Sequence, residues 1–389
     1  MHRQTRAVHV SAPPLDGSRP VSVPIYQTST FAFDDPDLLA EGLQRPDASF
    51  AYSRYANPTI RALENAVADL EGGQGAIACA SGMGAINSIL LALLRPGDHV
   101  IAQTCLYGGT YATFHDLAER FGVDVTYVSG EDPDEVRQAL RPETKVLYLE
   151  TIANPMVQVC DLPAMFAVSR EAGIVGVVDN TFASPELCRP IEHGADIVVH
   201  SATKYLGGHS DVVLGIAVFA DAERYRDVWQ HAIELGANAD PFAAWLTIRG
   251  LQTLPLRMRQ HCVNAEHLAV RLAGHPAVHA VHWPGLPTHP THELACRLLS
   301  GHGGVLSFEV SGDRERAREF SCRLRLAHRA ASLGGVETLV LHPASTTHRK
   351  LDEAALEAAG IYATTIRVAV GIEHPEDIWN DFDQALNGI

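Results

Sequence analysis

Lys204 is the first residue whose surroundings point to chemistry. It lies in His200-Ser-Ala-Thr-Lys-Tyr-Leu-Gly-Gly-His209, directly after the apolar run Asp196-Ile-Val-Val199, which predicts a strand. An amine held in apolar surroundings or beside a cation has a lowered pKa and can bond to the carbonyl carbon of a cofactor. Ser201 and Thr203 add hydroxyls that suit a phosphate. A surface lysine after a strand has the same local sequence, so this segment alone leaves both interpretations open.

Asp179 ends a second apolar run, Gly173-Ile-Val-Gly-Val-Val-Asp179-Asn-Thr181. An acid at the end of a central strand projects into the crevice where open α/β sheets bind ligands. There it would keep the ring nitrogen of a cofactor protonated. An Asp that caps a turn is the structural alternative. Asp179 precedes Lys204 by 25 residues with one further strand between them, so we expect both side chains in one crevice.

A small-residue turn in Ala76-Ile-Ala-Cys-Ala-Ser81-Gly82-Met83-Gly84-Ala85 joins a predicted strand to a helix. Free N–H groups at such a helix start form an anion site that accepts a phosphate. The same turn can serve packing alone. It is neither Gly-x-Gly-x-x-Gly nor a Gly-Lys-Ser/Thr loop, so it favours neither a dinucleotide nor a nucleoside triphosphate.

Further motifs follow in order along the chain. They are Pro24-Ile-Tyr-Gln-Thr-Ser-Thr30, Tyr52-Ser-Arg54-Tyr-Ala-Asn-Pro58-Thr59, Leu106-Tyr-Gly-Gly-Thr110, Glu150 with Asn154-Pro155, Ser332-Leu-Gly334, His342-Pro-Ala-Ser345 and Ile366-Arg-Val368. With the segments above, they resemble the Cys/Met-metabolism family of pyridoxal phosphate (PLP) enzymes. That family includes cystathionine γ-synthase, cystathionine γ-lyase, methionine γ-lyase and the O-acylhomoserine sulfhydrylases.

The resemblance implies a role for each matching residue. Lys204 would bind PLP covalently and act as a catalytic residue together with Tyr107, which would also stack on the cofactor ring. The other cofactor-binding residues would be Tyr52, Arg54, Gly82, Met83, Glu150, Asp179, Thr181, Ser201 and Thr203. Of these, Tyr52 and Arg54 would reach the phosphate from the neighbouring subunit of a dimer.

Substrate binding is implied for Arg367, with Asn154 and Ser332 beside it. The planar fork of donors on arginine suits a carboxylate. A solvated arginine in an alternating strand is the ordinary alternative, and only the surrounding motifs argue against it.

Composition fits an enzyme with a large core. The 389 residues are 46% apolar and 20% charged, and the net charge of −16 argues against nucleic acid or an anionic membrane as partner. Seven cysteines contain no Cys-x-x-Cys pair, and the 20 histidines suggest no metal-ligand spacing on a helix, so we expect no metal. The N-terminal residues lack the apolar core of a signal peptide, and we expect a cytoplasmic protein without a membrane span.

Three regions are expected from the pattern of elements. Residues 1–55 have little periodicity and are interpreted as an arm that packs on a partner subunit. Residues 56–240 begin with a helix capped by Asn57 and continue as alternating strands and helices, the pattern of a mainly parallel α/β sheet that would bind PLP. Residues 241–389 are expected to form a smaller α+β domain. By resemblance the fold is that of the PLP-dependent aminotransferases, fold type I, assembled as dimers that pair into a homotetramer.

The expected reaction is γ-elimination from a sulfur amino acid. Lys204 would move the α-proton and then the β-proton, and Tyr107 would assist the group that leaves Cγ as an acid. Hydrolysis of the product gives a 2-keto acid and ammonia, whereas attack by a thiol gives a new thioether.

The choice of family member rests on mixed signs. Ala80-Ser-Gly-Met-Gly-Ala-Ile-Asn-Ser-Ile-Leu90 and Leu94-Arg-Pro-Gly-Asp98 look most like methionine γ-lyases. Those lyases carry a cysteine where this chain has Gly109, and cystathionine γ-lyases carry a Glu where it has Ala331.

We therefore favour conversion of L-methionine to 2-oxobutanoate, methanethiol and ammonia. Cystathionine γ-lyase and γ-replacement by a cystathionine γ-synthase or O-acylhomoserine sulfhydrylase stay open. A non-catalytic binding protein is the remote alternative, since such a protein would be expected to have lost Lys204, Tyr107 or Arg367.

Overall fold

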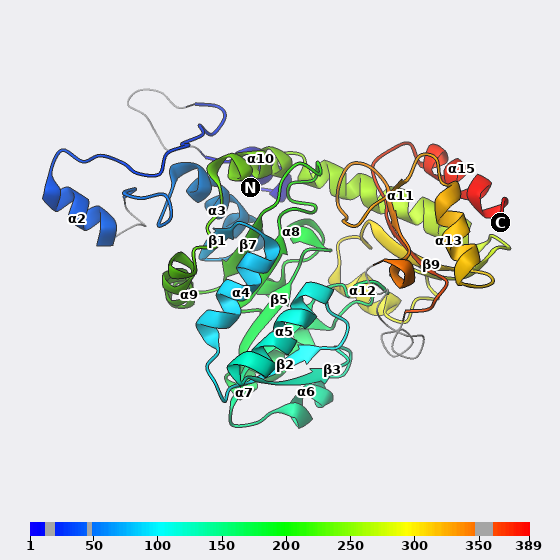
Figure 1. Cartoon of the computed structure of the whole chain (residues 1–389), viewed down its shortest axis with the longest axis horizontal. Helices are drawn as coiled ribbons and strands as arrows, with labels where there is room; N and C mark the ends of the chain where they lie inside the picture. Colours follow the sequence, from blue (N-terminus) through cyan, green and yellow to red (C-terminus); the bar gives the residue numbers. More distant parts are fainter. Residues whose placement is uncertain (12–19, 45–48, 347–360) are drawn as a thin grey trace.

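Two β-sheets organise the chain. The computed structural model describes residues 1–11, 20–44, 49–346 and 361–389. A seven-stranded sheet lies in the first two thirds of the sequence and a five-stranded sheet in the last third. Figure 1 shows the first sheet among cyan and green helices and the second among yellow and red ones, while the N-terminal arm with α2 projects from the body.

The seven-stranded sheet has the order β1-β7-β6-β5-β4-β2-β3. Its strands are β1 (Gly75–Cys79), β2 (His99–Gln103), β3 (Asp124–Val128), β4 (Thr144–Glu150), β5 (Val175–Asp179), β6 (Ile197–Ser201) and β7 (Gly215–Phe219). Strands β2 to β6 pair in parallel, which confirms the predicted mainly parallel sheet. Strand β7 was not anticipated, and it pairs antiparallel with both β6 and β1.

Both faces of this sheet are buried, as the alternating packing of β4 shows. Val146 and Tyr148 belong to a buried cluster that includes residues of α4, α5 and α9, whereas Leu147 and Leu149 belong to another cluster that includes residues of α3 and α7. Successive side chains of a strand point to opposite faces, so a strand with two covered faces is apolar throughout.

Most helices of the first two thirds flank this sheet or begin the chain. They are α1 (Arg3–Val8), α2 (Pro36–Gln44), α3 (Pro58–Glu71), α4 (Gly82–Leu93), α5 (Gly108–Phe121), α6 (Pro133–Ala139), α7 (Leu162–Ala172), α8 (Ser184–Leu187), the 3₁₀ turn η1 (Pro190–His193), α9 (Ala222–Leu235) and α10 (Pro241–Leu251). The predicted start of α3 is confirmed, because the Asn57 side chain accepts hydrogen bonds from the N–H groups of Thr59 and Ile60.

The five-stranded sheet has the order β10-β11-β12-β9-β8. Its strands are β8 (Val278–His282), β9 (Val305–Val310), β10 (His328–Arg329), β11 (Leu339–Leu341) and β12 (Thr365–Ala369). The remaining helices are α11 (Leu254–Ala273), α12 (His292–Leu298), α13 (Arg314–Arg323), the 3₁₀ turn η2 (Pro343–Ser345) and α15 (Pro375–Leu386). Helix α11 runs from the part of the molecule around the seven-stranded sheet toward the part around the five-stranded sheet (Figure 1). The domain limits at residues 55 and 240 stay predictions.

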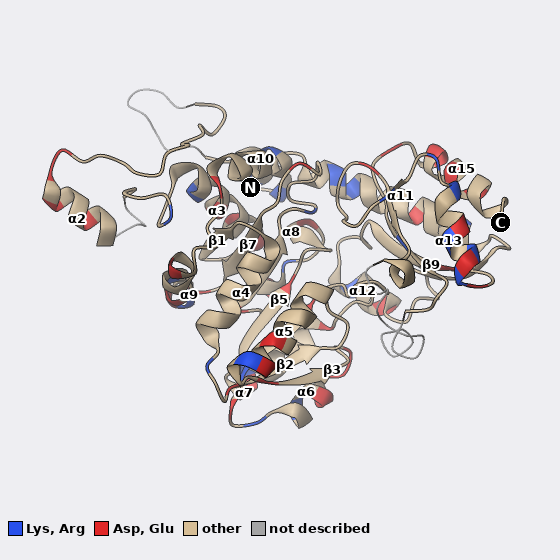
Figure 2. Cartoon of the chain, in the orientation of Figure 1, with Lys and Arg blue, Asp and Glu red and all other residues tan. Residues whose placement is uncertain are grey.

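Charged residues of both signs are interspersed along α9 and α13 (Figure 2). Across the described residues, no helix combines the length and apolar character that crossing a bilayer requires.

Candidate active site

A cavity of about 560 Å³ lies at the carboxyl ends of β4, β5 and β6, beside the start of α4. On the side of the five-stranded sheet, the cavity is lined by the segment from Ala331 to Leu333 and by strand β12. This is the edge at which open α/β sheets bind ligands. The predicted residues that line it are Gly82, Met83, Tyr107, Glu150, Asn154, Asp179, Thr181, Ser201, Thr203, Lys204, Ser332 and Arg367.

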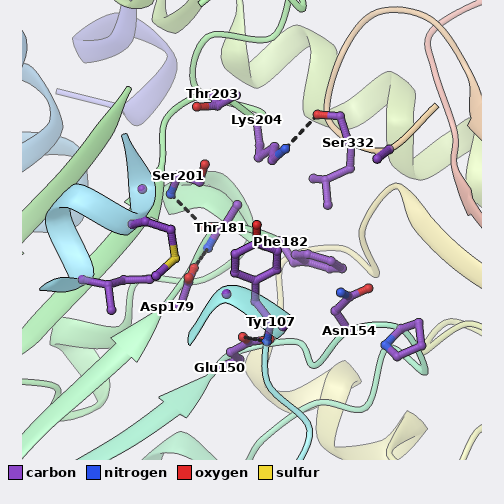
Figure 3. A pocket seen from close by; sticks show the side chains of 18 of the residues that line it. Tyr107, Glu150, Asn154, Asp179, Thr181, Phe182, Ser201, Thr203, Lys204 and Ser332 are labelled. Carbon is purple, nitrogen blue, oxygen red and sulfur yellow. Dashed lines mark hydrogen bonds between the residues drawn. The ribbon is translucent and has the colours of Figure 1, made fainter. Parts of the chain in front are cut away.

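Lys204 extends into the cavity toward Ser332 (Figure 3). Its Nζ donates a 2.8 Å hydrogen bond to the Ser332 hydroxyl. Burial, and then the charge of Arg367, lower the pKa of the amine from its ordinary value. The amine therefore loses its proton more readily than a surface lysine would.

The backbone next to Lys204 is tightly packed against Ser332-Leu-Gly334. Ser332 has φ +143°, a region that favours glycine, and such strain is common at ligand sites. Gly334 has φ +78°, and a Cβ there would lie 2.6 Å from the Tyr205 nitrogen. A side chain at position 334 would thus push this segment away from Lys204.

Arg367 lies on β12 and is only 8% exposed. One guanidinium nitrogen donates to Asn154 Oδ1 at 3.0 Å and another to the Ser332 carbonyl at 2.9 Å. Its Nε has no partner, and Arg367 forms no ion pair with any acid in the part of the chain that the structure describes. Burial lowers the pKa of Arg367 to about 10, so at neutral pH the site holds an unneutralised cation.

Two acids face the cavity from neighbouring strands, because Glu150 of β4 pairs with Asp179 of β5 in the sheet register. Burial raises the pKa of both carboxyl groups, and the charge of Asp179 raises that of Glu150 further. Glu150 Oε1 accepts the N–H of Tyr107 at 2.6 Å, and Asp179 Oδ1 accepts the N–H of Thr181 at 2.9 Å. A cationic ligand group here would be stabilised by this negative charge.

The start of α4 supplies the predicted anion site. The Ser81 hydroxyl accepts the N–H of Gly84 at 3.0 Å, while Gly82 and Met83 line the cavity. The first N–H groups of a helix have no acceptor within it. A Cβ at Gly82 would lie 2.9 Å from the Cβ of Ser201, so only glycine lets α4 approach the end of β6 this closely.

The hydroxyls predicted to bind phosphate have different surroundings. The N–H of Ser201 donates to Thr181 Oγ1 at 2.8 Å, which ties the ends of β5 and β6 together. The Thr203 hydroxyl donates to the Leu214 carbonyl at 3.2 Å and accepts the N–H of Leu214 at 3.0 Å. Thr203 would have to release that carbonyl before it could donate to a phosphate.

Tyr107 stands at the mouth of the cavity with 51% of its surface exposed. A Cβ at Gly109 would lie 2.5 Å from the Tyr107 ring and 2.9 Å from the Met83 sulfur. Glycine at position 109 therefore permits this position of the ring, which a larger residue would displace.

Tyr52 and Arg54 do not line this cavity. Arg54 instead donates a 2.7 Å hydrogen bond to the Ile233 carbonyl, and its guanidinium lies over the rings of Tyr52 and Tyr55. Their predicted contribution to a neighbouring subunit's site stays a prediction.

Phe182 lines the cavity immediately after Thr181 and was not predicted from the sequence. A buried group of polar side chains around Asn180, the neighbour of Asp179, was not predicted either. His200 Nε2 lies 2.6 Å from Glu71 Oε1, which also accepts from the Asn180 side chain at 2.9 Å. His200 adjoins the Ser-Ala-Thr-Lys segment, which was a signal, whereas Glu71 ends a distant helix and had none.

Comparison with known proteins gives consistent matches. A model of the family described as Cys/Met metabolism PLP-dependent enzyme matches residues 4–387. The L-methionine γ-lyase of Fusobacterium nucleatum subsp. polymorphum is 42% identical over 374 residues, which cover 95% of this chain and 94% of that protein. The cystathionine β-lyase of Coxiella burnetii is 42% identical over 390 residues, with 99% and 98% covered.

A solved structure agrees in fold. The cystathionine γ-synthase from Xanthomonas oryzae pv. oryzae, crystallised in complex with aminoacrylate and cysteine, superposes with a TM-score of 0.93 at 40% identity. The match covers 100% of this chain and 98% of that one. These three relatives carry three different reaction names at nearly equal identity.

Proposed function

The chain belongs to the Cys/Met metabolism PLP-dependent enzymes, and from this premise we propose that it catalyses γ-elimination of L-methionine to 2-oxobutanoate, methanethiol and ammonia. The observation that carries the choice is the distribution of charge in the cavity. Among the described lining residues, the only acids are Glu150 and Asp179, which lie together at the strand ends. The uncharged side chain of methionine needs no further acid.

The cavity residues fit PLP. The start of α4 with Ser201 suits its phosphate, and the buried carboxyl of Asp179 suits a protonated ring nitrogen. Lys204 supplies an amine with a lowered pKa. When bound, PLP supplies a carbonyl carbon that bonds to amines and a ring that accepts electrons from the substrate.

Lys204 is proposed to hold the cofactor at rest and to move protons once the substrate amine has replaced it. Its Nζ would take the proton from the substrate Cα, pass it on to the carbonyl carbon that the cofactor supplies, and then, as a neutral amine again, take the proton from Cβ. Ser332, 2.8 Å from Nζ, orients the amine during these transfers. Tyr107 at the cavity mouth would give a proton to the sulfur that leaves Cγ.

Arg367 is proposed to bind the substrate carboxylate. Its unpaired Nε and its buried charge without an acid partner among the described residues support this role. Asn154 and the Ser332 carbonyl fix the guanidinium plane through hydrogen bonds, so the donor fork is oriented before the substrate arrives.

Position 331 supports methionine over cystathionine. Ala331 lines the cavity next to Ser332, so no carboxylate stands there to pair with a second substrate ammonium. Burying an unpaired ammonium is costly. The His342-Pro-Ala-Ser345 motif is shared with sulfhydrylases, so γ-replacement stays the second candidate. Pro343 of this motif lines the cavity. Thr347 and His348, which follow the motif, lie outside the described residues.

We further propose that two subunits share each site. The projecting arm exposes Leu38, Leu39 and Leu43 of α2, which is expected if a second copy covers it. Tyr52 and Arg54 follow this arm and lie outside the cavity of their own chain, which supports a role in the partner's site. Pairing of dimers into a tetramer is part of the same proposal.

A product assay with the PLP-loaded protein tests the function. L-Methionine should give 2-oxobutanoate and methanethiol. The kcat/KM for release of a keto acid should be higher with L-methionine than with L-cystathionine. Cystathionine cleaved at Cγ would give cysteine, and at Cβ homocysteine with pyruvate, which separates the two lyase activities. If O-acylhomoserine plus sulfide gave homocysteine while neither thioether released keto acid, γ-replacement would take the place of this proposal.

A further inference from the structure

Three potential metal ligands converge outside the active-site cavity. His292 and Cys296 lie one turn apart on α12, and His302 follows in the loop that leads to β9. Cys296 Sγ is 3.6 Å from the Nε2 atoms of both histidines, and the three donor atoms lie within 4.8 Å of one another. The expectation of no metal stays a prediction, and His292-x-x-x-Cys296 is a helical spacing of two possible ligands that it did not consider.

The two sulfur–nitrogen distances match those of a tetrahedral zinc site. Zinc–sulfur and zinc–nitrogen bonds of about 2.3 and 2.05 Å, set at the tetrahedral angle, place sulfur and nitrogen about 3.6 Å apart. Without a metal, the thiol would donate its one hydrogen to one imidazole and weakly accept an N–H from the other. One shared metal ion would account for both sulfur–nitrogen distances at once.

The tautomer of His292 also suits a metal. Its Nδ1 lies 2.8 Å from the Pro284 carbonyl, which can only accept, so Nδ1 carries the hydrogen and Nε2 presents a lone pair toward Cys296. Metal-binding histidines commonly have such a carbonyl partner.

The surroundings hold His302 in place and leave Cys296 accessible. The His302 ring packs edge-on against Trp283, which is 2% exposed and donates to the Gly303 carbonyl at 3.1 Å. Cys296 is exposed, so an ion can enter from solvent and keep a water as its fourth ligand.

We propose that His292, Cys296 and His302 bind one Zn²⁺ ion, with a water as the fourth ligand. On binding, the Cys296 thiol releases its proton to solvent, and both imidazoles bind as neutral ligands. The soft sulfur donor disfavours Mg²⁺ and Ca²⁺. None of the three residues lines the active-site cavity, so the ion would join α12 to the loop before β9 without taking part in the reaction.

Protection of the thiol in the unaltered chain is the first test. The PLP-loaded, tag-free protein is freed of metal and excess PLP, and alkylation of each cysteine by iodoacetamide is followed by peptide mass spectrometry. Zn²⁺ should slow alkylation of Cys296 at least tenfold and alkylation of Cys322, another exposed free cysteine, less than twofold. Mg²⁺ should protect neither, and equal rates at Cys296 with and without Zn²⁺ would overturn the proposal.

Zinc affinity is the second test, measured by competition with a chromogenic chelator. The unaltered protein should bind one Zn²⁺ per chain at least 100-fold more tightly than Cys296→Ser or His302→Ala. Cys322→Ser is the matched control and should bind as the parent does. If Cys296→Ser bound zinc as tightly as the parent, the cluster would be a hydrogen-bonded thiol and imidazole pair instead. Both tests read metal binding directly and are independent of the proposed reaction.

Discussion

Replacing Arg367 with lysine should weaken recognition of the substrate carboxylate while keeping the positive charge. Arg367 already uses hydrogen bonds to Asn154 and Ser332 to fix its plane, so its remaining donors can meet both oxygens of a carboxylate. Lysine loses one of these two contacts, each worth about 1.5–3 kcal/mol when a charged group takes part. A loss of about 2 kcal/mol corresponds to a roughly 30-fold lower kcat/KM for an amino acid substrate.

The test compares L-methionine with 3-(methylthio)propylamine, which has the same side chain and no carboxylate. Binding of both to the PLP-loaded protein is measured from the change in its visible spectrum. The parent should bind methionine more tightly than the amine. Arg367→Lys should reduce the ratio of the two affinities about 30-fold, because it weakens binding of methionine and leaves binding of the amine unchanged.

Arg257→Lys is the matched control, because Arg257 is equally buried but donates to the carbonyls of Tyr205 and Gly250. It should lower Tm and leave the preference unchanged. An Arg367→Lys variant whose preference stayed within threefold of the parent would refute the assignment.

Three further outcomes are expected. Oligomers made only of Lys204→Ala or only of Arg54→Ala chains should have little activity. Hybrid dimers of the two should regain activity at one site, where the intact Arg54 of one chain meets the intact Lys204 of the other. No activity at any mixing ratio would mean that each site is built from one chain. Ala331→Glu should shift the kcat/KM ratio toward cystathionine at least tenfold, since a carboxylate there can pair with the distal ammonium; an unchanged ratio would show that position 331 does not contact that end of the substrate. Burial lowers the pKa of His261 to about 4 from 6.5, so between these pH values the unfolded chain binds a proton that the folded chain does not. Stability should therefore decrease by up to about 3 kcal/mol as the pH falls from 6.5 toward 4. Tm of His261→Gln should fall less between pH 7 and 5 than Tm of the parent, and parallel curves would contradict this.

The residues at strand ends were predictable because their signal is local. Lys204 and Asp179 each follow an apolar run, and the rule that parallel strands meet ligands at one edge places them together. Arg367 had no such local signal, since an arginine in an alternating strand is ordinarily solvated. Its burial depends on the packing of β12 between β9 and β11, which no short pattern reports.

Strand β7 shows a different limit. Gly215-Ile-Ala-Val-Phe219 has the apolar character of a buried strand, but residues 202–214, which join it to β6, form no helix. Parallel neighbours are usually joined by a helix that crosses over the sheet, whereas here the chain turns back and β7 runs antiparallel to β6. The missing helix was therefore the available evidence. The pairing of His200 with Glu71, 129 positions apart, had no comparable signal.

The unpaired charges of the cavity bear on stability as well as on binding. Arg367 is a buried cation without an acid partner in the described chain, and Glu150 and Asp179 are buried acids whose carboxyl pKa values are raised. Each group costs folding free energy, because burial favours its neutral form. Arg367 does not offset the acids, since its hydrogen bonds direct it to Asn154 and Ser332. A cationic ring nitrogen on the cofactor would pair with the acids, and a substrate carboxylate would pair with Arg367. Binding of both should therefore stabilise the fold, because it relieves the cost of these buried charges in addition to the new contacts.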